Sequence, residues 1–121
     1  MAALYSELLL DHFRRPRNYG SLPAPDTSYE LVNPLCGDRV RIELKLDDQV
    51  VSEARFKGDG CAISIAAASL LTEIITASEL KRALEITNDE MIAALRSDIK
   101  PAREQCALLA LEALRHALGQ A

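Results

Sequence analysis

The sequence predicts one α+β domain in which helices cover a three-stranded antiparallel sheet. Two hydrophobic patterns support this class: apolar and polar residues alternate between Arg39 and Phe56, and the apolar spacing becomes helical after Gly60. Helical patterns precede and follow the strands, which is typical of an α+β layer structure and not of a βαβ series. The 121 residues suffice for a single hydrophobic core, and no repeat or linker suggests a second domain, so residues 1–121 are expected to form one domain.

The first elements are expected to be a helix, a loop and a short strand. Leucines at helical spacing predict a helix over residues 3–15, and Pro16 ends it because the residue before a proline avoids the α region. Residues 18–26 contain one glycine and two prolines and therefore predict a loop. The run Tyr29–Val32 is expected to form the first strand.

The central strand has the clearest pattern. Between Arg39 and Asp47, apolar residues at every second position alternate with charged ones, which predicts a strand with one solvent-facing side. Asp47-Asp48-Gln49 supplies a turn. The alternation continues on a return strand and completes an antiparallel meander, through Val50, Ser52, Ala54 and Phe56.

The second half of the chain predicts helices only. Seven apolar residues between Ile63 and Ile75 fall at helical spacing and form one broad stripe, which can cover the apolar face of the sheet. Three further helical stretches are expected: residues 81–84, a capped helix over Thr87–Leu95, and a closing helix over residues 106–118 that follows Pro101.

The chain contains three cysteines, Cys36, Cys61 and Cys106. Cys36 lies in a glycine-containing loop before the central strand. Cys61 and Cys106 lie close to predicted helix N-termini, where the helix macrodipole favours a thiolate. Soft thiolates from three distant segments suit zinc, copper(I) or an iron–sulfur cluster. The alternative for any one of them is a buried thiol that packs as a small hydrophobic side chain.

A fourth ligand is available two residues after Cys36. The Asp38 carboxylate can ligate zinc or iron, and Gly37 relaxes the backbone between the two side chains. We therefore predict a metal site built from Cys36, Asp38, Cys61 and Cys106. Intervals of 25 and 45 residues separate the cysteines, which is too wide for a local zinc finger, so the tertiary fold must assemble the site. An exposed site of this kind suits the onward transfer of a cluster or a sulfur atom.

Charge and hydropathy disfavour several classes of function. A net charge of −4 and an isoelectric point near 5.2 argue against a nucleic-acid-binding surface. No apolar run approaches the roughly 20 residues of a membrane span, and the first residues do not resemble a signal peptide. The odd number of cysteines argues against a disulfide framework. We therefore expect a cytoplasmic protein with reduced thiols and with neither nucleic acid nor membrane as a partner.

Five segments occur in an informative order: Tyr5-Ser6, Asp11-His12-Phe13, Pro16-Arg17-Asn18 with Gly20, Asn33-Pro34-Leu35-Cys36-Gly37-Asp38, and Gly58-Asp59-Gly60-Cys61-Ala62-Ile63-Ser64. Together with a third cysteine on the last helix, they resemble the U-type iron–sulfur scaffold family, which includes IscU, SufU and the N-terminal domain of NifU. The resemblance extends over essentially the whole chain. It implies the SufE/NifU-like scaffold fold, iron binding, and a [2Fe–2S] cluster assembled on the three cysteines and Asp38.

The same resemblance implies how the cluster is made and used. Sulfur would arrive as a persulfide from a pyridoxal-phosphate cysteine desulfurase, and Cys106 is expected to be the accessible, thiolate-rich acceptor. The finished cluster would pass to iron–sulfur acceptor proteins. The chain is then a scaffold or carrier rather than an enzyme.

Two departures from the family pattern bear on this function. IscU-like members usually have a histidine before the third cysteine, but here Gln105 offers an amide, which cannot act as an imidazole ligand. Ile99–Arg103 has lost one proline of the Leu-Pro-Pro-Val-Lys segment that a dedicated Hsp70 chaperone recognises, which argues against that partner. The absent histidine and Ala62-Ile63-Ser64 after the second cysteine are closer to SufU, although the insertion that SufU-like members carry is missing.

Two alternatives to the scaffold function therefore stay open. SufU-like members resemble zinc-bound sulfur acceptors that hold the metal on the same three cysteines and the aspartate. The chain can accordingly be interpreted as a zinc-dependent sulfurtransferase that relays sulfur from a desulfurase. The other alternative is a structural or regulatory zinc-binding module.

Overall fold

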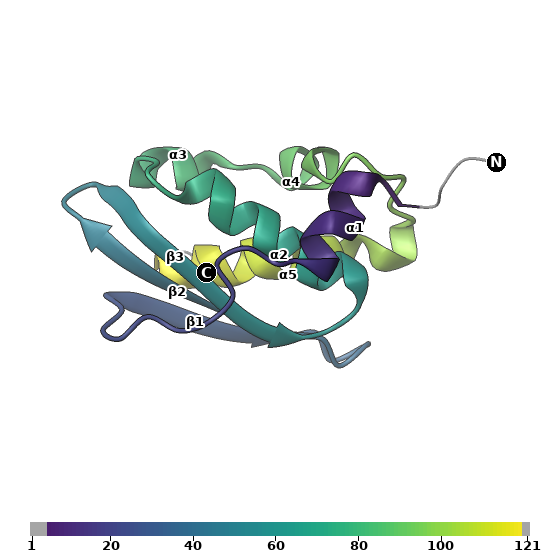
Figure 1. Ribbon diagram of the computed structural model, residues 1–121, viewed down its shortest axis with the longest axis horizontal. Coiled ribbons are helices and arrows are strands. Elements are labelled where there is room, and N and C mark those ends of the chain that lie inside the picture. Colours follow the sequence, from purple (N-terminus) through teal and green to yellow (C-terminus); the bar gives the residue numbers. More distant parts are fainter. Residues whose placement is uncertain (1–4, 120–121) are drawn as a thin grey trace.

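The computed structural model describes residues 5–119 and confirms the predicted α+β class. Figure 1 shows the sheet as one layer and the helices as the other. The elements follow in the order α1 (Glu7–Arg14), β1 (Thr27–Val32), β2 (Arg39–Asp47), β3 (Val50–Asp59), α2 (Ala62–Ile75), α3 (Leu80–Glu85), α4 (Asn88–Ala94), the 3₁₀ turn η1 (Pro101–Arg103) and α5 (Glu104–Ala117).

The helices begin where local capping allows it. The predicted first helix started at residue 3, and residues 3 and 4 lie outside the described residues. Within them, α1 begins at Glu7, because the Ser6 hydroxyl accepts the Leu9 N–H at 3.0 Å. The predicted cap of α4 is confirmed as a reciprocal capping box between Thr87 and Glu90. No helix in this described part of the chain is long and apolar enough to cross a membrane.

The three strands pair antiparallel in the order β1-β2-β3, which confirms the predicted meander. The prediction for the start of β3 was wrong in one respect: Val51 is buried there, whereas Val50 and Ser52 are half-buried. The cause is a register shift beside Leu46, which pairs with Val51. A bulge adds one unpaired residue to a strand and so reverses which side chains face inward.

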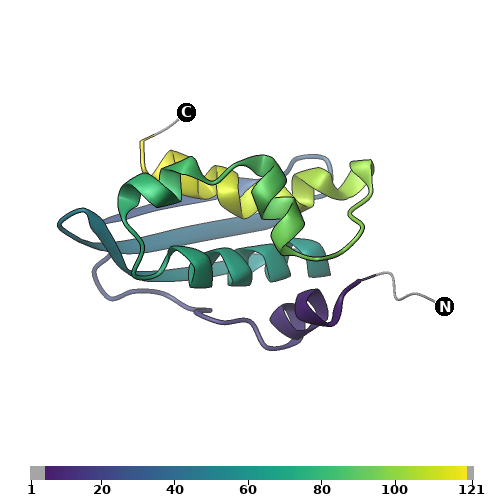
Figure 2. The same ribbon diagram turned by 90° about the horizontal axis from the view of Figure 1, so that it is seen from above.

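The helices α2 and α5 lie side by side over one face of the sheet, and α1 flanks α2 (Figure 2). The single apolar stripe predicted for α2 was too narrow, because this helix has neighbours on several sides. Ile74 belonged to the stripe and is 41% exposed, while Ser64 and Ser69 lay outside it and are fully buried. Small side chains let α1, α5 and the sheet approach α2 closely.

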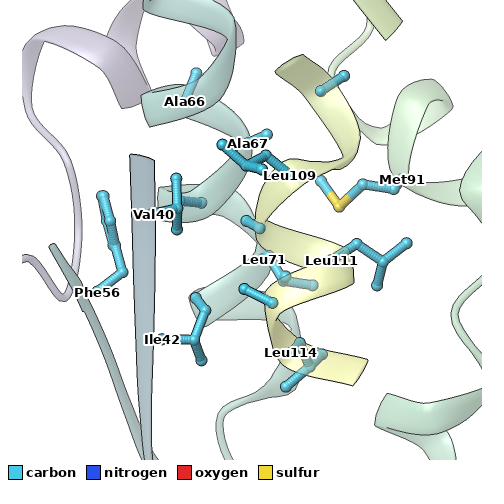
Figure 3. Close-up of a cluster of buried hydrophobic side chains, with 14 of the residues drawn as sticks. Val40, Ile42, Phe56, Ala66, Ala67, Leu71, Met91, Leu109, Leu111 and Leu114 are labelled. Carbon is cyan, nitrogen blue, oxygen red and sulfur yellow. The ribbon is translucent and has the colours of Figure 1, made fainter. Parts of the chain in front are cut away.

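The core lies between β2 and the α2–α5 pair. Figure 3 shows side chains of these elements meeting there, among them Ile42, Leu71 and Leu114, which have no exposed surface. Burying one such side chain contributes about 1.5–3 kcal/mol to stability. This packing places the N-terminal ends of α2 and α5 at the end of the sheet where β1 leads into β2, on the right in Figure 1. All three cysteine segments therefore lie at one end of the molecule.

The edge of the sheet at β3 is partly covered by the loop after α1. Gly20 N–H donates to the Phe56 carbonyl at 2.9 Å, and Phe56 N–H donates to the Asn18 carbonyl at 3.0 Å. Tyr19 thereby forms a short parallel bridge with Phe56, and their rings pack edge to face with centroids 5.1 Å apart. The predicted loop thus adds a short third pairing to the sheet, at the β3 edge.

A buried histidine connects α1 to α2. His12 is 3% exposed, its Nδ1 lies 2.7 Å from Ser69 Oγ, and its Nε2 lies 3.3 Å from the Glu73 carboxylate. Ser69 Oγ also accepts the Arg17 backbone N–H at 2.8 Å, so its own proton can be donated to Nδ1. The arrangement suits a neutral imidazole with its proton on Nε2. Burial, assisted by the Arg17 charge, lowers the pKa of His12 from its usual 6.5.

This histidine predicts a pH-dependent stability. Because the folded imidazole has the lower pKa, the unfolded state binds the extra proton as the pH falls below about 6.5, and the free energy of unfolding decreases. The slope cannot exceed about 1.4 kcal/mol per pH unit for one group. Urea denaturation with chelator, between about pH 8 and about pH 5.5, should show a steeper decline for wild type than for His12→Gln. Equal slopes in the two proteins would contradict the assignment to His12.

Candidate metal centre

The loop between β1 and β2 is closed by two backbone hydrogen bonds. Asn33 N–H donates to the Asp38 carbonyl at 2.8 Å, and Gly37 N–H donates to the Asn33 carbonyl at 2.7 Å. Gly37 has a φ of +77°, a left-handed conformation that favours glycine. The closed loop presents Cys36 as an exposed thiol, next to Leu35, which is 84% exposed.

The other two cysteines lie at the starts of helices, as predicted. Cys61 is the N-cap residue of α2. Cys106 is in the first turn of α5, which follows the 3₁₀ turn that begins at Pro101. Unpaired backbone N–H groups at these helix ends favour negatively charged sulfur.

The fold brings three of the four predicted ligands together directly. The ligand atoms of Cys36, Asp38 and Cys106 all lie within 4.8 Å of one another. Sulfur ligands of one tetrahedral zinc ion lie about 3.8 Å apart when each Zn–S bond is about 2.3 Å, so a small contraction is enough. Cys61 is not in this group, but its Sγ lies 3.5 Å from the Ser64 hydroxyl that donates to Asp38, so it borders the same site. Thiolates with one carboxylate fit zinc or iron.

Asp38 is more enclosed than its loop position predicted. A position in a loop beside Gly37 favours an exposed carboxylate that contributes little to the fold, but Asp38 is only 7% exposed. Burial opposes its ionisation, yet hydrogen bonds from the Ser64 hydroxyl, from the thiol and backbone N–H of Cys61, and from Cys36 outweigh burial and hold its pKa below the usual value. The Ser64 hydrogen bond thereby holds the Asp38 carboxylate at the start of α2, whose N-cap residue Cys61 makes no side-chain cap hydrogen bond.

Cys106 differs from the accessible, thiolate-rich nucleophile that the sequence predicted. It is 3% exposed, and burial, together with the neighbouring Cys61 and Cys36, raises the pKa of its thiol to about 12. The helix start and the neighbouring positive charge of Arg103 do not overcome these effects. A bound metal would keep this sulfur deprotonated, as thiol ligands are when coordinated.

Other candidate residues have different surroundings. Gln105 lines a separate cleft of about 220 Å³ between β1 and α5. His116 stacks on Tyr29 with ring centroids 4.6 Å apart, and His12 belongs to the α1–α2 contact. Sequence reasoning missed the bond from Ser64 to Asp38; the available signal was a hydroxyl residue in the first turn of the helix that Cys61 caps.

Comparison with known proteins gives these features a family context. Residues 4–120 match the family described as NifU-like N terminal domain. The zinc-dependent sulfurtransferase SufU of Bacillus subtilis is 37% identical over 134 residues, an alignment that covers 97% of this chain and 90% of the relative. The iron–sulfur cluster assembly scaffold protein IscU of Escherichia coli is 35% identical over 119 residues, covering 95% and 91%.

A solved structure extends the similarity to the fold. A putative iron–sulfur cluster assembly scaffold protein for the SUF system from Fervidobacterium islandicum superposes with a TM-score of 0.80 at 24% identity, covering 95% of this chain and 96% of that chain. This likeness agrees with the three-stranded sheet and its helical layer. The match over residues 4–120 and the two relatives above 30% identity establish that the chain belongs to the family of NifU-like N-terminal domains.

Proposed function

We propose that the chain is an iron–sulfur cluster assembly scaffold that binds iron, accepts sulfur from a cysteine desulfurase and transfers a [2Fe–2S] cluster to acceptor proteins. The observation that carries the proposal is the convergence of Cys36, Asp38 and Cys106, with Cys61 at their border. One thiol of this set is exposed while another is buried, so one side of the site is accessible to partners. The reduced thiols that this function needs fit the cytoplasm.

Sulfur transfer needs an accessible thiol, and Cys36 has the exposed position. In such a transfer a thiolate attacks the terminal sulfur of the donor's persulfide, a new S–S bond forms, and the donor's thiolate leaves without net oxidation. Cys36 is therefore our structural choice for the first acceptor. The sequence-based choice, Cys106, would need the site to open, since its thiol is buried.

Sulfur loading can be assigned to single cysteines. After incubation of the metal-free chain with a pyridoxal-phosphate cysteine desulfurase and cysteine, mass spectrometry of peptides should locate an added sulfur on Cys36. We expect Cys36→Ser to lose most of the loading and Cys106→Ser to retain most of it. Loss confined to Cys106→Ser would instead support the buried thiol as the acceptor, and the scaffold function would stand either way.

A zinc-dependent sulfur carrier is the second candidate function. Two observations favour it: the set of three thiols and one carboxylate suits tetrahedral zinc, and the relative from Bacillus subtilis is named a zinc-dependent sulfurtransferase. In this function the same residues hold zinc, and only sulfur is passed on. A structural zinc module would hold zinc without accepting sulfur.

Metal content separates these functions. The chain should be purified without air, with a parallel aerobic preparation, and both analysed for iron, sulfide and zinc. A scaffold should carry or readily rebuild a cluster with equal amounts of iron and sulfide and transfer it to an apo-ferredoxin. If the chain instead held one zinc ion, stimulated desulfurase turnover and formed no cluster, the carrier function would be the better description.

A further inference from the structure

We propose that Ser64 is a positioning residue that makes Asp38 a one-oxygen ligand of the metal. This inference rests on the proposed function, because it concerns how the site holds its metal. Ser64 lies in the first turn of α2, has no exposed surface, and donates its hydroxyl proton to Oδ2 of Asp38. Because Oδ2 already accepts this proton, Oδ1 is the oxygen more available to a metal ion.

The surroundings of Ser64 show that this bond is built into the fold. The hydroxyl has a single proton, and the Asp38 carboxylate accepts it. The other neighbour of Ser64 Oγ is Cys61 Sγ at 3.5 Å, so one hydroxyl contacts two residues of the predicted ligand set.

Gly60 limits the space in which Asp38 can move. A Cβ atom at this position would lie 3.0 Å from Cγ of Asp38 and 3.1 Å from Cβ of Ser64. These distances are close enough that a side chain at residue 60 would push Asp38 and Ser64 apart. The glycine therefore leaves just enough room for the hydrogen-bonded pair.

The chemical consequence concerns coordination geometry and metal affinity. A carboxylate that is free to rotate can bind through either or both oxygens, whereas a tetrahedral site with three sulfurs needs only one. Residues that hold a ligand in orientation typically change metal affinity about 10- to 100-fold when they are removed. Ser64 orients the Asp38 ligand through its hydrogen bond, although Ser64 itself need not touch the metal.

The test measures Zn²⁺ affinity by competition with a chromophoric chelator for wild type, Ser64→Ala, Asp38→Ala and the double variant. We expect Ser64→Ala to bind Zn²⁺ about 10- to 100-fold more weakly. If Ser64 acts through Asp38, adding Ser64→Ala to the Asp38→Ala variant should weaken Zn²⁺ binding by less than about threefold. Ser69→Ala is the matched control: it removes another fully buried serine of α2, which hydrogen-bonds to His12 and Arg17, and should leave Zn²⁺ affinity unchanged.

A spectroscopic measurement adds a readout that a purely structural role would not change. With Co²⁺ in place of zinc, the wild type should show the intense visible bands of a four-coordinate ion, and Ser64→Ala should show weaker bands as the carboxylate binds through both oxygens. Gly60→Ala should resemble Ser64→Ala in both measurements. Thermal melts in chelator verify that each variant is folded.

Each result decides the proposal. Wild-type affinity and an unchanged Co²⁺ spectrum in folded Ser64→Ala would overturn it, as would an undiminished effect of this change in the Asp38→Ala background. Equal losses in Ser64→Ala and Ser69→Ala would assign the effect to helix packing instead. If the wild type itself bound neither Zn²⁺ nor Co²⁺, the proposed function would fail, and that outcome differs visibly from failure of the positioning role alone.

Discussion

Replacing Cys106 by serine is expected to weaken Zn²⁺ binding by at least about 100-fold and to prevent stable cluster assembly. Loss of an outer-shell partner alone costs about 10- to 100-fold, and a directly bound thiolate contributes more than such a partner. Cys106 lies within 4.8 Å of both Cys36 and Asp38, on the buried side of the site, where solvent cannot easily replace its sulfur. Chelator competition and reconstitution with iron and sulfide measure the two effects.

The neighbouring Gln105 provides the control for this experiment. It precedes Cys106 in the same helical turn, but its side chain lines the cleft between β1 and α5. Gln105→Ala should therefore keep zinc affinity and cluster yield within about twofold of wild type, because it removes no sulfur ligand. A Zn²⁺ dissociation constant of folded Cys106→Ser close to that of wild type would remove Cys106 from the ligand set.

Asp38→Ala is expected to destabilise both the fold and a zinc site. Removing the carboxylate leaves the buried Ser64 hydroxyl without its acceptor, and an unsatisfied buried polar group costs about 1–3 kcal/mol. This expectation differs from the one that the loop sequence suggests, namely that the fold would be unaffected. Zinc should bind more weakly because one of four ligands is lost. A [2Fe–2S] cluster should instead persist longer, if the exchangeable carboxylate normally lets partners or solvent displace it.

Asp38→Asn separates the two roles of this residue. The amide oxygen can still accept the hydrogen bond of Ser64, but it lacks the negative charge of a carboxylate ligand. We expect Asn to restore most of the stability in urea denaturation without restoring zinc affinity. Parallel measurements of zinc affinity and cluster lifetime on all three proteins complete the test. If neither quantity changed, three cysteines with an external fourth ligand would describe the site better.

The sequence alone was sufficient for the elements whose signals are local. The β2 strand has its predicted bounds because its period-two alternation involves only adjacent residues. The cap of α4 could be predicted because Thr87 and Glu90 lie within one turn of each other. The placement of Cys61 and Cys106 at helix starts has the same local basis. The four ligand candidates could be proposed because their residue types define the chemistry, whatever their distance along the chain.

Only the tertiary structure decided how these residues are surrounded. The bulge that makes Val51 rather than Val50 the buried residue arises from pairing with β2, which the β3 sequence does not contain. Asp38 is buried because its loop folds onto the start of α2, 26 residues from Ser64 in the sequence. Cys106 is a buried thiol of high pKa rather than an accessible thiolate, because burial and nearby sulfurs outweigh the helix terminus. Burial and through-space charge depend on segments distant in the sequence, so residue types predicted the site's chemistry, and packing determined its accessibility and its hydrogen bonds.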